Sequence, residues 1–300
     1  MIKITFLGTS SMLPTRKRNH TSILLQYQKE GIMIDCGEGT QRQLRMAGIS
    51  SCKVTKLLIT HFHGDHALGI PGLLQSLVAN QCQKTIEIYG PVGTKKHIYH
   101  MMKGIEFQGY KRLKYKVTEL SKSKVFYKDK DLSLKCGKAD HTTPTLMYQF
   151  KENDKLKINL KYLKKFGLKT HPLLGKLQQG KDIVYKGKKI SVKKATTGKK
   201  GKKITIILDT APSRNLSKFA QDSDLLICES TWSAHMHHLT SRRKHLTSKQ
   251  AAEVAKKAKV KKLFLTHFSQ RYKDLAELLN EAKKIFKNTH LSKDFMKVEV

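Results

Sequence analysis

The most concentrated chemistry in the chain is a hexapeptide at residues 61–66, with the sequence HFHGDH. It places three imidazoles and one carboxylate within six residues. Imidazole nitrogen and carboxylate oxygen are ligands of zinc and similar divalent ions, and so many ligands this close cannot all bind one ion. In an extended stretch His61 and His63 point the same way, which leaves Asp65 and His66 for a second position. The spacing therefore predicts two adjacent metal ions.

The elements around the hexapeptide place it at a strand-to-helix turn. Residues 56–60 form a short apolar run that predicts a buried strand, and residues 68–78 carry helical spacing of Leu and Ile. The cluster thus lies at the carboxyl end of a strand, where α/β architectures place their sites. The alternative is a surface His-rich turn or a tag-like tract. Tags lie at termini, whereas this cluster is framed by a hydrophobic strand and helix.

Three further ligand candidates follow predicted strands. An isolated histidine is more often a core or surface residue than a ligand, but a site opened by His61 and His63 needs a third protein ligand, and His141 follows a strand. Asp209 ends the apolar run at residues 204–208, where a carboxylate can offer one oxygen to each of two metals. His267 ends the last predicted core strand and completes the set.

Other polar residues near strand ends are predicted to support these ligands. Asp35 is predicted to hold a ligand histidine by its other ring nitrogen, and Glu229, which ends another strand, is given the same kind of supporting role. His245 precedes the Thr-x-x-Gln capping box at residues 247–250. It therefore lies at the positive end of a helix, where an imidazole can meet a developing anion. His235, His237 and His238 are predicted to be a polar connection and not ligands.

The charge of the chain indicates a polyanionic partner. Lys and Arg total 59 against 23 Asp and Glu, a formal net charge of +36, and nucleic acid is the first candidate. The alternative is an ordinary lysine-rich surface. The basic loop Arg16, Lys17, Arg18 and Asn19 suits a phosphodiester backbone, with a solvated loop as the alternative. Arg271 and Tyr272 could offer a phosphate fork and a stacking face.

Length and composition predict one large domain, residues 1–300, with an insertion. Between residues 151 and 203 lysines crowd the sequence and sheet-like alternation is lost, with a short basic helix predicted at residues 160–166. We expect an inserted arm at about residues 152–185. The alternative is an unstructured charged insertion with no specific role.

The five cysteines are scattered and form no Cys-x-x-Cys pair, which argues against a disulfide scaffold and for a reducing compartment. The amino terminus lacks the zones of a signal peptide, and no apolar run approaches the roughly 20 residues needed to cross a bilayer. We therefore expect a cytoplasmic protein with no membrane partner.

The hexapeptide after a strand resembles the signature of the metallo-β-lactamase superfamily. Six further stretches occur in the order of the ribonuclease Z (tRNase Z) family and span nearly the whole chain: GTS at 8–10, PTRKRN at 14–19, IDCGEGTQ at 34–41, LDT at 208–210, HLT at 245–247 and THFSQRY at 266–272. The resemblance implies an α/β protein with a four-layer αββα metallo-β-lactamase sandwich. It also implies two zinc ions per subunit, a homodimer, and an arm that grips tRNA.

The resemblance implies a zinc-dependent endoribonuclease. It would remove the 3′ trailer from precursor tRNA, leaving a 3′ hydroxyl on the tRNA and a 5′ phosphate on the trailer. His61, His63 and His141 would hold one zinc. Asp65, His66 and His267 would hold the other, with Asp209 as the bridge. Asp65 would also take the proton of the attacking water, and His245 would stabilise the phosphate or protonate the leaving oxygen.

Two other classes of function remain open at this stage. A small-molecule hydrolase of the same superfamily would act on a thioester, lactone or cyclic phosphodiester, and its basic charge would be incidental. The basic loop, the insertion and the segment at residues 268–272 argue against that class. A nucleic-acid-binding protein with an inactive site is a third class, which the presence of every expected ligand disfavours.

Overall fold

The computed structural model describes residues 1–107, 109 and 112–300, and the chain divides into two compact units. The first unit comprises residues 1–127, 134–150 and 203–300. The second comprises residues 128–133 and 151–202. Most of the sequence, including every predicted metal ligand, belongs to the first unit.

One sheet of the first unit begins as an antiparallel meander and continues in parallel. The order is β18-β1-β2-β3-β4-β5-β6, in which β1, β2 and β3 pair antiparallel and β3 to β6 pair parallel. The strands are β1 (Lys3–Gly8), β2 (Ser22–Tyr27), β3 (Glu30–Ile34), β4 (Lys56–Leu58), β5 (Ile86–Pro91), β6 (Tyr115–Leu120) and β18 (Lys297–Glu299).

The second sheet has the order β17-β16-β15-β14-β9-β8-β7, and β14 to β17 pair in parallel. Continuous apolar runs such as residues 225–228 suit strands covered on both faces. The strands are β7 (Lys124–Lys128), β8 (Leu132–Ala139), β9 (Thr145–Glu152), β14 (Lys203–Ile207), β15 (Leu225–Glu229), β16 (Leu263–Thr266) and β17 (Thr289–Leu291).

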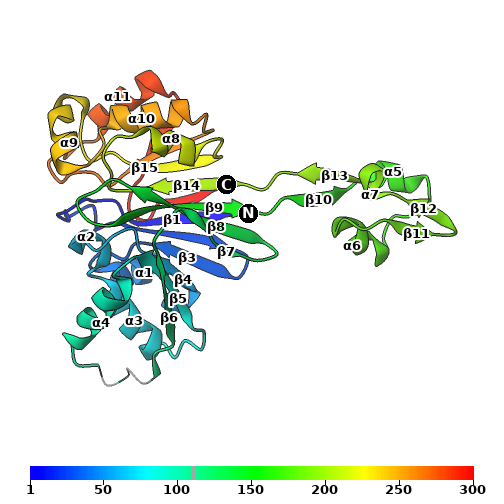
Figure 1. Cartoon of the computed structure of the whole chain (residues 1–300), viewed down its shortest axis with the longest axis horizontal. Helices are drawn as coiled ribbons and strands as arrows, with labels where there is room; N and C mark the ends of the chain where they lie inside the picture. Colours follow the sequence, from blue (N-terminus) through cyan, green and yellow to red (C-terminus); the bar gives the residue numbers. More distant parts are fainter. Residues whose placement is uncertain (108, 110–111) are drawn as a thin grey trace. The chain divides into compact units, whose positions relative to one another are not determined.

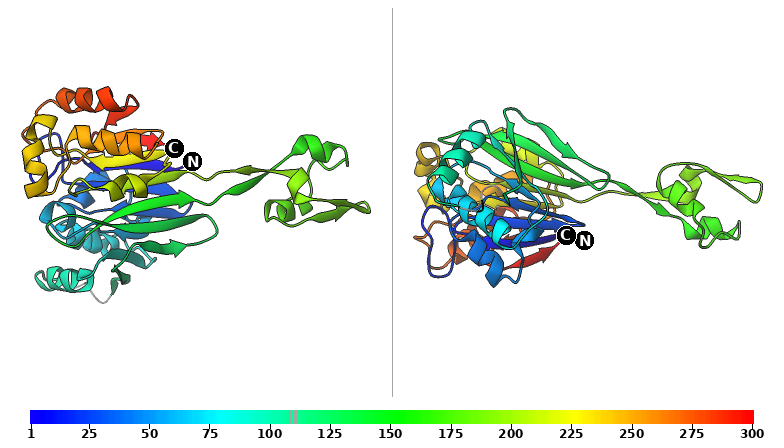
Figure 2. Two further views of the ribbon diagram at one scale, coloured as in Figure 1. Left: turned by 45° about the horizontal axis from the view of Figure 1, so that its top comes forward. Right: turned by 90° about the horizontal axis from the view of Figure 1, so that it is seen from below.

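Helices cover the outer face of each sheet, so the first unit has four layers (Figure 1). The first sheet is covered by α1 (Thr40–Met46), α3 (Ile70–Ala79) and α4 (Thr94–Lys103), and the second by α8 (Arg214–Ala220), α10 (Ser248–Lys257) and α11 (Ala276–Ile285). Figure 2 shows the same layers from two further directions. The predicted αββα sandwich is confirmed.

The core and the helix ends follow the sequence pattern. Phe6 of β1 and Phe264 of β16 pack together between the sheets, with ring centroids 5.7 Å apart. Thr247 and Gln250 form the predicted capping box at the start of α10. The apolar side of that helix packs on the second sheet and consists of Ala251, Ala252, Val254, Ala255 and Ala258. The helix therefore begins at Ser248, three residues after His245, at a fixed place beside the sheet.

The second unit is folded, so the alternative of an unstructured insertion is wrong. Strand β10 pairs with β13, and β11 pairs with β12. Its small apolar core contains Leu163, Leu168, Leu177, Ile183 and Ile190. Its elements are β10 (Lys155–Ile158), α5 (Leu160–Lys164), α6 (Leu173–Gln178), β11 (Ile183–Tyr185), β12 (Lys188–Ile190), α7 (Val192–Ala195) and β13 (Thr196–Lys199). The expected arm, residues 152–185, lies within this unit, which continues to Lys202.

The cysteines depart from expectation at one pair. Cys52 and Cys82 form a disulfide, with Cα atoms 5.3 Å apart, whereas Cys36, Cys136 and Cys228 are buried free thiols. The two partners are 30 residues apart in the sequence, and they meet because the short helix η1 (Ser51–Lys53) packs on the end of α3. Sequence spacing carries no sign of that packing. No helix in the described part of the chain is long and apolar enough to span a membrane.

Candidate metal centre

The predicted ligands converge at the carboxyl ends of strands from both sheets. Strand β4 leads to the hexapeptide, β8 to His141, β14 to Asp209 and β16 to His267. The short helix α2 (Gly64–Ala67) turns the chain inside the hexapeptide, so that Asp65 and His66 face a different group of atoms from His61 and His63. Residues up to 206 positions apart in the sequence therefore meet in one cluster, as the strand ends predicted.

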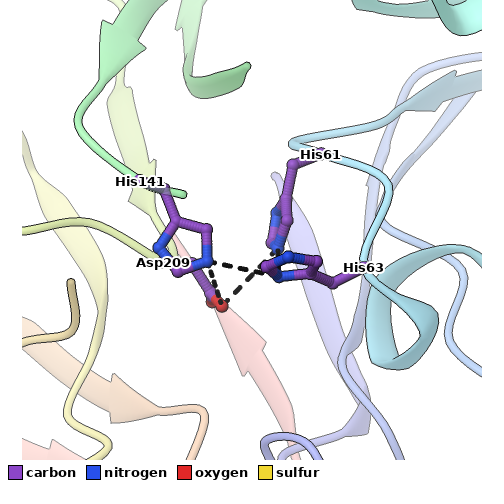
Figure 3. Close-up of side chains that lie close together, drawn as sticks. All are labelled: His61, His63, His141 and Asp209. Atoms are coloured by element: carbon purple, nitrogen blue, oxygen red, sulfur yellow. Dashed lines mark hydrogen bonds and ion pairs between the residues drawn. The ribbon is translucent and has the colours of Figure 1, made fainter. Parts of the chain in front are cut away.

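One group of ligand atoms is formed by His61, His63, His141 and Asp209 (Figure 3). His61 Nε2 lies 3.1 Å from His63 Nδ1, and His141 Nε2 lies 3.2 Å from the same atom. Asp209 Oδ2 lies 3.6 Å from His61 Nε2 and 3.7 Å from His141 Nε2. Four donor atoms thus surround one small volume.

The second group is formed by Asp65, His66 and His267, with the other oxygen of Asp209. His66 Nε2 and His267 Nε2 are 3.1 Å apart, and each lies 3.4 Å from Asp65 Oδ2. Asp209 Oδ1 lies 3.3 Å from His66 Nε2 and 3.1 Å from His267 Nε2. Asp209 therefore presents one oxygen to each group, which is the arrangement of a bridging ligand.

The spacing of these atoms fits tetrahedral zinc. Ligands about 2.0–2.1 Å from a tetrahedral ion lie about 3.3–3.4 Å from one another. The donor-to-donor distances given above, 3.1–3.7 Å, scatter around that value. Asp209 Oδ1 is also buried without a hydrogen-bond donor among the described residues. A buried carboxylate oxygen left without a donor is costly unless a cation satisfies it, so the donor set fits two divalent ions.

Each of the five histidines has a polar partner at its other ring nitrogen, and a partner that can only accept a hydrogen bond fixes the tautomer. The partners are the Thr60 hydroxyl for His61, the Thr142 hydroxyl for His63, the Asp35 carboxylate for His66, the Lys244 carbonyl for His141 and the Thr231 hydroxyl for His267. Four histidines face the cluster through Nε2, and His63 does so through Nδ1.

Two buried carboxylates stand behind these partners. Asp35 accepts hydrogen bonds from His66 Nδ1 at 2.6 Å and from the Thr60 backbone N–H and hydroxyl at 2.7 Å each. Since the Thr60 hydroxyl donates to Asp35, it accepts from His61 Nδ1. Asp35 therefore orients one histidine of each group. Its backbone, at φ 56°, has a left-handed conformation that costs free energy and is typical of functional positions.

Glu229 has the matching position in the other sheet. It accepts from the Thr231 hydroxyl at 2.6 Å, and that hydroxyl in turn accepts from His267 Nδ1 at 2.9 Å. Its second oxygen accepts from the backbone N–H of Thr210, next to Asp209. The sequence missed Thr60 and Thr231 as supports, and the only signal for either was a hydroxyl residue close to a predicted ligand or carboxylate.

The local charges keep the two acidic ligands ionised. Burial opposes ionisation of Asp65 and Asp209, but the surrounding histidines outweigh burial and hold the pKa of both carboxyl groups below the ordinary range. Both residues are therefore carboxylates able to bind a cation.

His245 lies beside the cluster but is bound to a carboxylate. Its Nδ1 is 3.3 Å from Glu229 Oε2 and 3.7 Å from Asp209 Oδ2, and its ring stacks on that of His267 with centroids 5.5 Å apart. Burial opposes protonation, but the charges of Glu229 and Asp209 outweigh it and raise the pKa of His245 to about 9. A cationic imidazole here can donate a proton or stabilise an anion.

The predicted basic loop follows β1 and lies against the segment that carries His267. The backbone of Ser11 donates to the carbonyl of Phe268. Arg18 donates to the carbonyls of Ser269 and Tyr272, and Asn19 donates to the carbonyl of Glu38. These two side chains hold the loop in place. Arg16 and Lys17 are exposed, so they are the loop residues free to meet a phosphate.

Arg271 and Tyr272 differ in exposure. The exposed guanidinium of Arg271 lies over the Trp232 ring, 4.7 Å from its centroid, which is cation–π contact. Tyr272 is only 9% exposed, and its hydroxyl is hydrogen-bonded to the backbone N–H of Ser233. A stacking face at Tyr272 was therefore the wrong expectation, because the side chain packs inside the fold. Trp232, which the sequence did not single out, holds Arg271.

The remaining histidines lie outside the two ligand groups. Residues 234–239 form the short helix η3 (Ala234–Leu239), and His237 and His238 are exposed. His235 lies near Glu277 and Glu281 in an exposed group, and exposed acidic groups of this kind commonly hold no metal.

Comparison with known proteins gives matches over the full chain. Ribonuclease Z of Methanothermobacter thermautotrophicus is 40% identical over 304 residues, covering 100% of this chain and 97% of that protein. The structure of human tRNase Z, short form, matches with a TM-score of 0.71 and 27% identity, over 99% of this chain and 98% of that one. The metallo-β-lactamase fold protein YhfI of Bacillus subtilis also gives a TM-score of 0.71, at 17% identity and with 99% and 98% coverage.

A family model described as anti-Pycsar protein Apyc1 matches residues 2–160. That match covers the first half of the chain, with the hexapeptide and His141, and stops before Asp209, His245 and His267. The match to ribonuclease Z sequences instead includes every residue of the cluster.

Proposed function

The chain belongs to the ribonuclease Z family, and we propose that it removes the 3′ trailer from precursor tRNA. The products would be a tRNA with a 3′ hydroxyl and a trailer with a 5′ phosphate. The observation that carries the proposal is the pair of ligand groups that share Asp209, because such a site suits hydrolysis of a phosphodiester. Relatives named ribonuclease Z over the full length do not favour a small-molecule hydrolase.

We propose two zinc ions as the cofactors. His61, His63 and His141 would hold one, Asp65, His66 and His267 the other, with Asp209 shared. The nitrogen-rich donor set and the tetrahedral spacing support zinc over calcium or magnesium, which prefer oxygen ligands. When bound, the two ions would activate water near neutral pH and neutralise charge on the phosphate.

The side chains of this chain would divide the remaining work. Asp65 is an ionised carboxylate at the cluster and would take the proton of the attacking water. His245 would donate to the leaving oxygen or stabilise the phosphate, a role that its bond to Glu229 and its raised pKa support. Arg16, Lys17 and Arg271 would bind phosphates of the RNA, since all three are exposed cations.

We propose that the second unit is the arm that binds tRNA. Its support is the lysine-rich sequence of residues 151–202 and a core of its own. Replacing Lys155–Lys199 by a short Gly/Ser linker should remove the folded insertion while keeping the backbone hydrogen bond from Glu152 to Lys202. Cleavage of precursor tRNA should fall and its salt dependence should flatten, since fewer counterions are released on binding. Unchanged cleavage at near-physiological salt would refute the role.

The family resemblance also supports a homodimer that acts in the cytoplasm on precursor tRNA. Light scattering of the purified protein tests the dimer. A monomer at concentrations where the enzyme is active would refute it.

The test of the function is incubation of the zinc-loaded protein with a precursor tRNA bearing a 3′ trailer, with the cut mapped at nucleotide resolution. We expect one cut at the 3′ end of the mature tRNA. Asp209→Ala should abolish the cut and reduce bound zinc, whereas His237→Ala, a change at an exposed histidine, should alter neither. An intact tRNA precursor together with rapid hydrolysis of a thioester or lactone would favour the small-molecule class.

A further inference from the structure

A cavity of about 480 Å³ opens beside His141 in the first unit. It lies where β5, β6 and β8 end and where the chain turns into β9. Its volume is in the range of about 300–1,000 Å³ typical of small-molecule sites. The lining residues are Pro91, Val92, Leu120, Ser121, Lys138, Ala139, His141, Thr142, Thr143, Pro144, Thr145 and Leu146.

The cavity adjoins the first ligand group, and none of the second group's residues Asp65, His66 and His267 lines it. His141 lines it, and Thr142, also in the lining, has its hydroxyl 3.4 Å from His63 Nε2. Both histidines belong to the first ligand group. The basic loop instead lies against the segment after His267, a ligand of the second group. A strand of RNA that reaches the shared Asp209 from the loop side would therefore meet this cavity on the other side of the metals.

The lining has the chemistry of a nucleotide subsite. The aliphatic faces of Pro91, Val92 and Leu120 suit the flat face of a base, and threonine hydroxyls and the Lys138 amine suit its polar edge and the adjoining phosphate. Val92 lines the cavity and is 58% exposed, so its side chain lies at the mouth, where a ligand can reach it.

The charges around the cavity also suit an anionic ligand. No carboxylate is among its lining residues in the described part of the chain. Two acids nearby are already occupied. Glu119 accepts from the backbone N–H groups of Gly93 and Lys95, and Asp140 is paired with the Lys244 amine at 2.7 Å.

We infer that this cavity binds the nucleotide next to the scissile phosphate, on the side of the metals opposite the basic loop. The inference rests on the proposed function and adds to it a contact at the level of one base. The cavity would set how well the base beside the cut is held, and hence how precisely the phosphate is placed over the two ligand groups.

The test combines an enzyme variant that narrows the mouth of the cavity with precursor tRNAs that lack one base beside the scissile phosphate. Val92→Trp fills the opening from an exposed position, and Val125→Trp is the matched control, since Val125 is 54% exposed and does not line the cavity. Substrates are precursor tRNAs with an abasic nucleotide directly 5′ or directly 3′ of the scissile phosphate. Zinc content and far-ultraviolet circular dichroism establish that each variant is folded and loaded.

We expect Val92→Trp to lower kcat/KM on intact precursor tRNA by on the order of tenfold, a loss typical of one misfitted pocket contact. Val92→Leu should lose less, and Val125→Trp should match the wild type. At one of the two abasic positions the wild type should lose a similar factor and Val92→Trp should lose nothing further, because the same contact is already gone. That position identifies the bound nucleotide.

Two results would overturn the inference while leaving the function intact: wild-type kcat/KM in Val92→Trp, or losses that simply multiply at both abasic positions. Failure of the wild-type enzyme to cut any precursor tRNA would instead remove the proposed function and this subsite with it.

Discussion

Asp35 lies outside both ligand groups but orients histidines of both, so its substitution tests how hydrogen bonds behind the ligands affect metal affinity. The substitution is Asp35→Asn, which keeps the size of a fully buried side chain and removes its charge. In the native chain one oxygen accepts from the Thr60 N–H, and the other accepts from both the Thr60 hydroxyl and His66 Nδ1. An amide has one acceptor oxygen and one NH₂ donor.

The magnitude follows from this count of acceptors. If the NH₂ group of Asn replaces Oδ1, it faces the Thr60 backbone N–H; if it replaces Oδ2, it faces both the Thr60 hydroxyl and His66 Nδ1–H. In the second orientation the His66 ring must lose its hydrogen bond or move its proton to Nε2, which then cannot bind a metal. A hydrogen bond to a charged group contributes about 1.5–3 kcal/mol, which corresponds to a loss of roughly 10–100-fold in metal affinity, the range found for partners of metal-binding histidines.

The assay is competition for zinc between the protein and a chromogenic chelator, resolved into two dissociation constants. We expect weaker binding mainly at the group that contains His66, and a smaller change at the group of His61, which Asp35 reaches only through Thr60. Asp294→Asn is the matched control, because Asp294 also accepts from a backbone N–H and side-chain donors but contacts no ligand. Wild-type affinity in Asp35→Asn, or an equal loss in Asp294→Asn, would refute the reasoning.

Three further outcomes are expected. His245→Ala should lose on the order of a hundredfold or more in turnover with zinc content unchanged, and loss of zinc would identify His245 as a ligand. Glu229→Gln should lower the pKa of His245, because it removes one of the charges that hold that pKa at about 9. The fall in kcat at alkaline pH should therefore move to lower pH. A fall in kcat at the same pH as in the wild type would contradict proton donation by His245. Replacing both Cys52 and Cys82 by serine should destabilise the fold by about 3–4 kcal/mol in the loop-closure model for a 30-residue separation. If the wild-type protein unfolded at the same temperature with and without reductant, a formed disulfide would be contradicted.

The ligand positions could be predicted from the sequence because the residue types that bind metals stand at the ends of the predicted strands. A polar residue that ends a buried apolar run lies at a sheet edge, and parallel strands bring such edges together. His61, His141, Asp209 and His267 each follow such a run, so their proximity could be predicted from the sequence. The same reasoning identified Asp35 and Glu229 as acids at strand ends.

Contacts between elements that no local pattern encodes could not be predicted. Tyrosine is a residue type that often stacks on bases, but the side chain of Tyr272 points into the fold, where its hydroxyl accepts a hydrogen bond from the Ser233 N–H. Cys52 and Cys82 meet only because η1 packs on the end of α3. The separate core of the insertion could not be predicted either, because its many lysines mask the few apolar residues that build that core.

Two series of hydrogen bonds, each running from a carboxylate through a threonine to a histidine, support the site in the same way from both sheets. Asp35, Thr60 and His61 follow the first sheet, and Glu229, Thr231 and His267 follow the second. In each series the threonine hydroxyl donates to a buried carboxylate and so must accept from the histidine, which leaves the other ring nitrogen unprotonated for a metal. Each carboxylate also holds a second histidine directly, His66 in one case and His245 in the other. The difference lies in what that second histidine meets: His66 lies within a ligand group, whereas His245 lies beside one, 3.7 Å from the shared Asp209. In the proposed mechanism, the same kind of support would prepare His66 as a metal ligand and His245 as a proton donor.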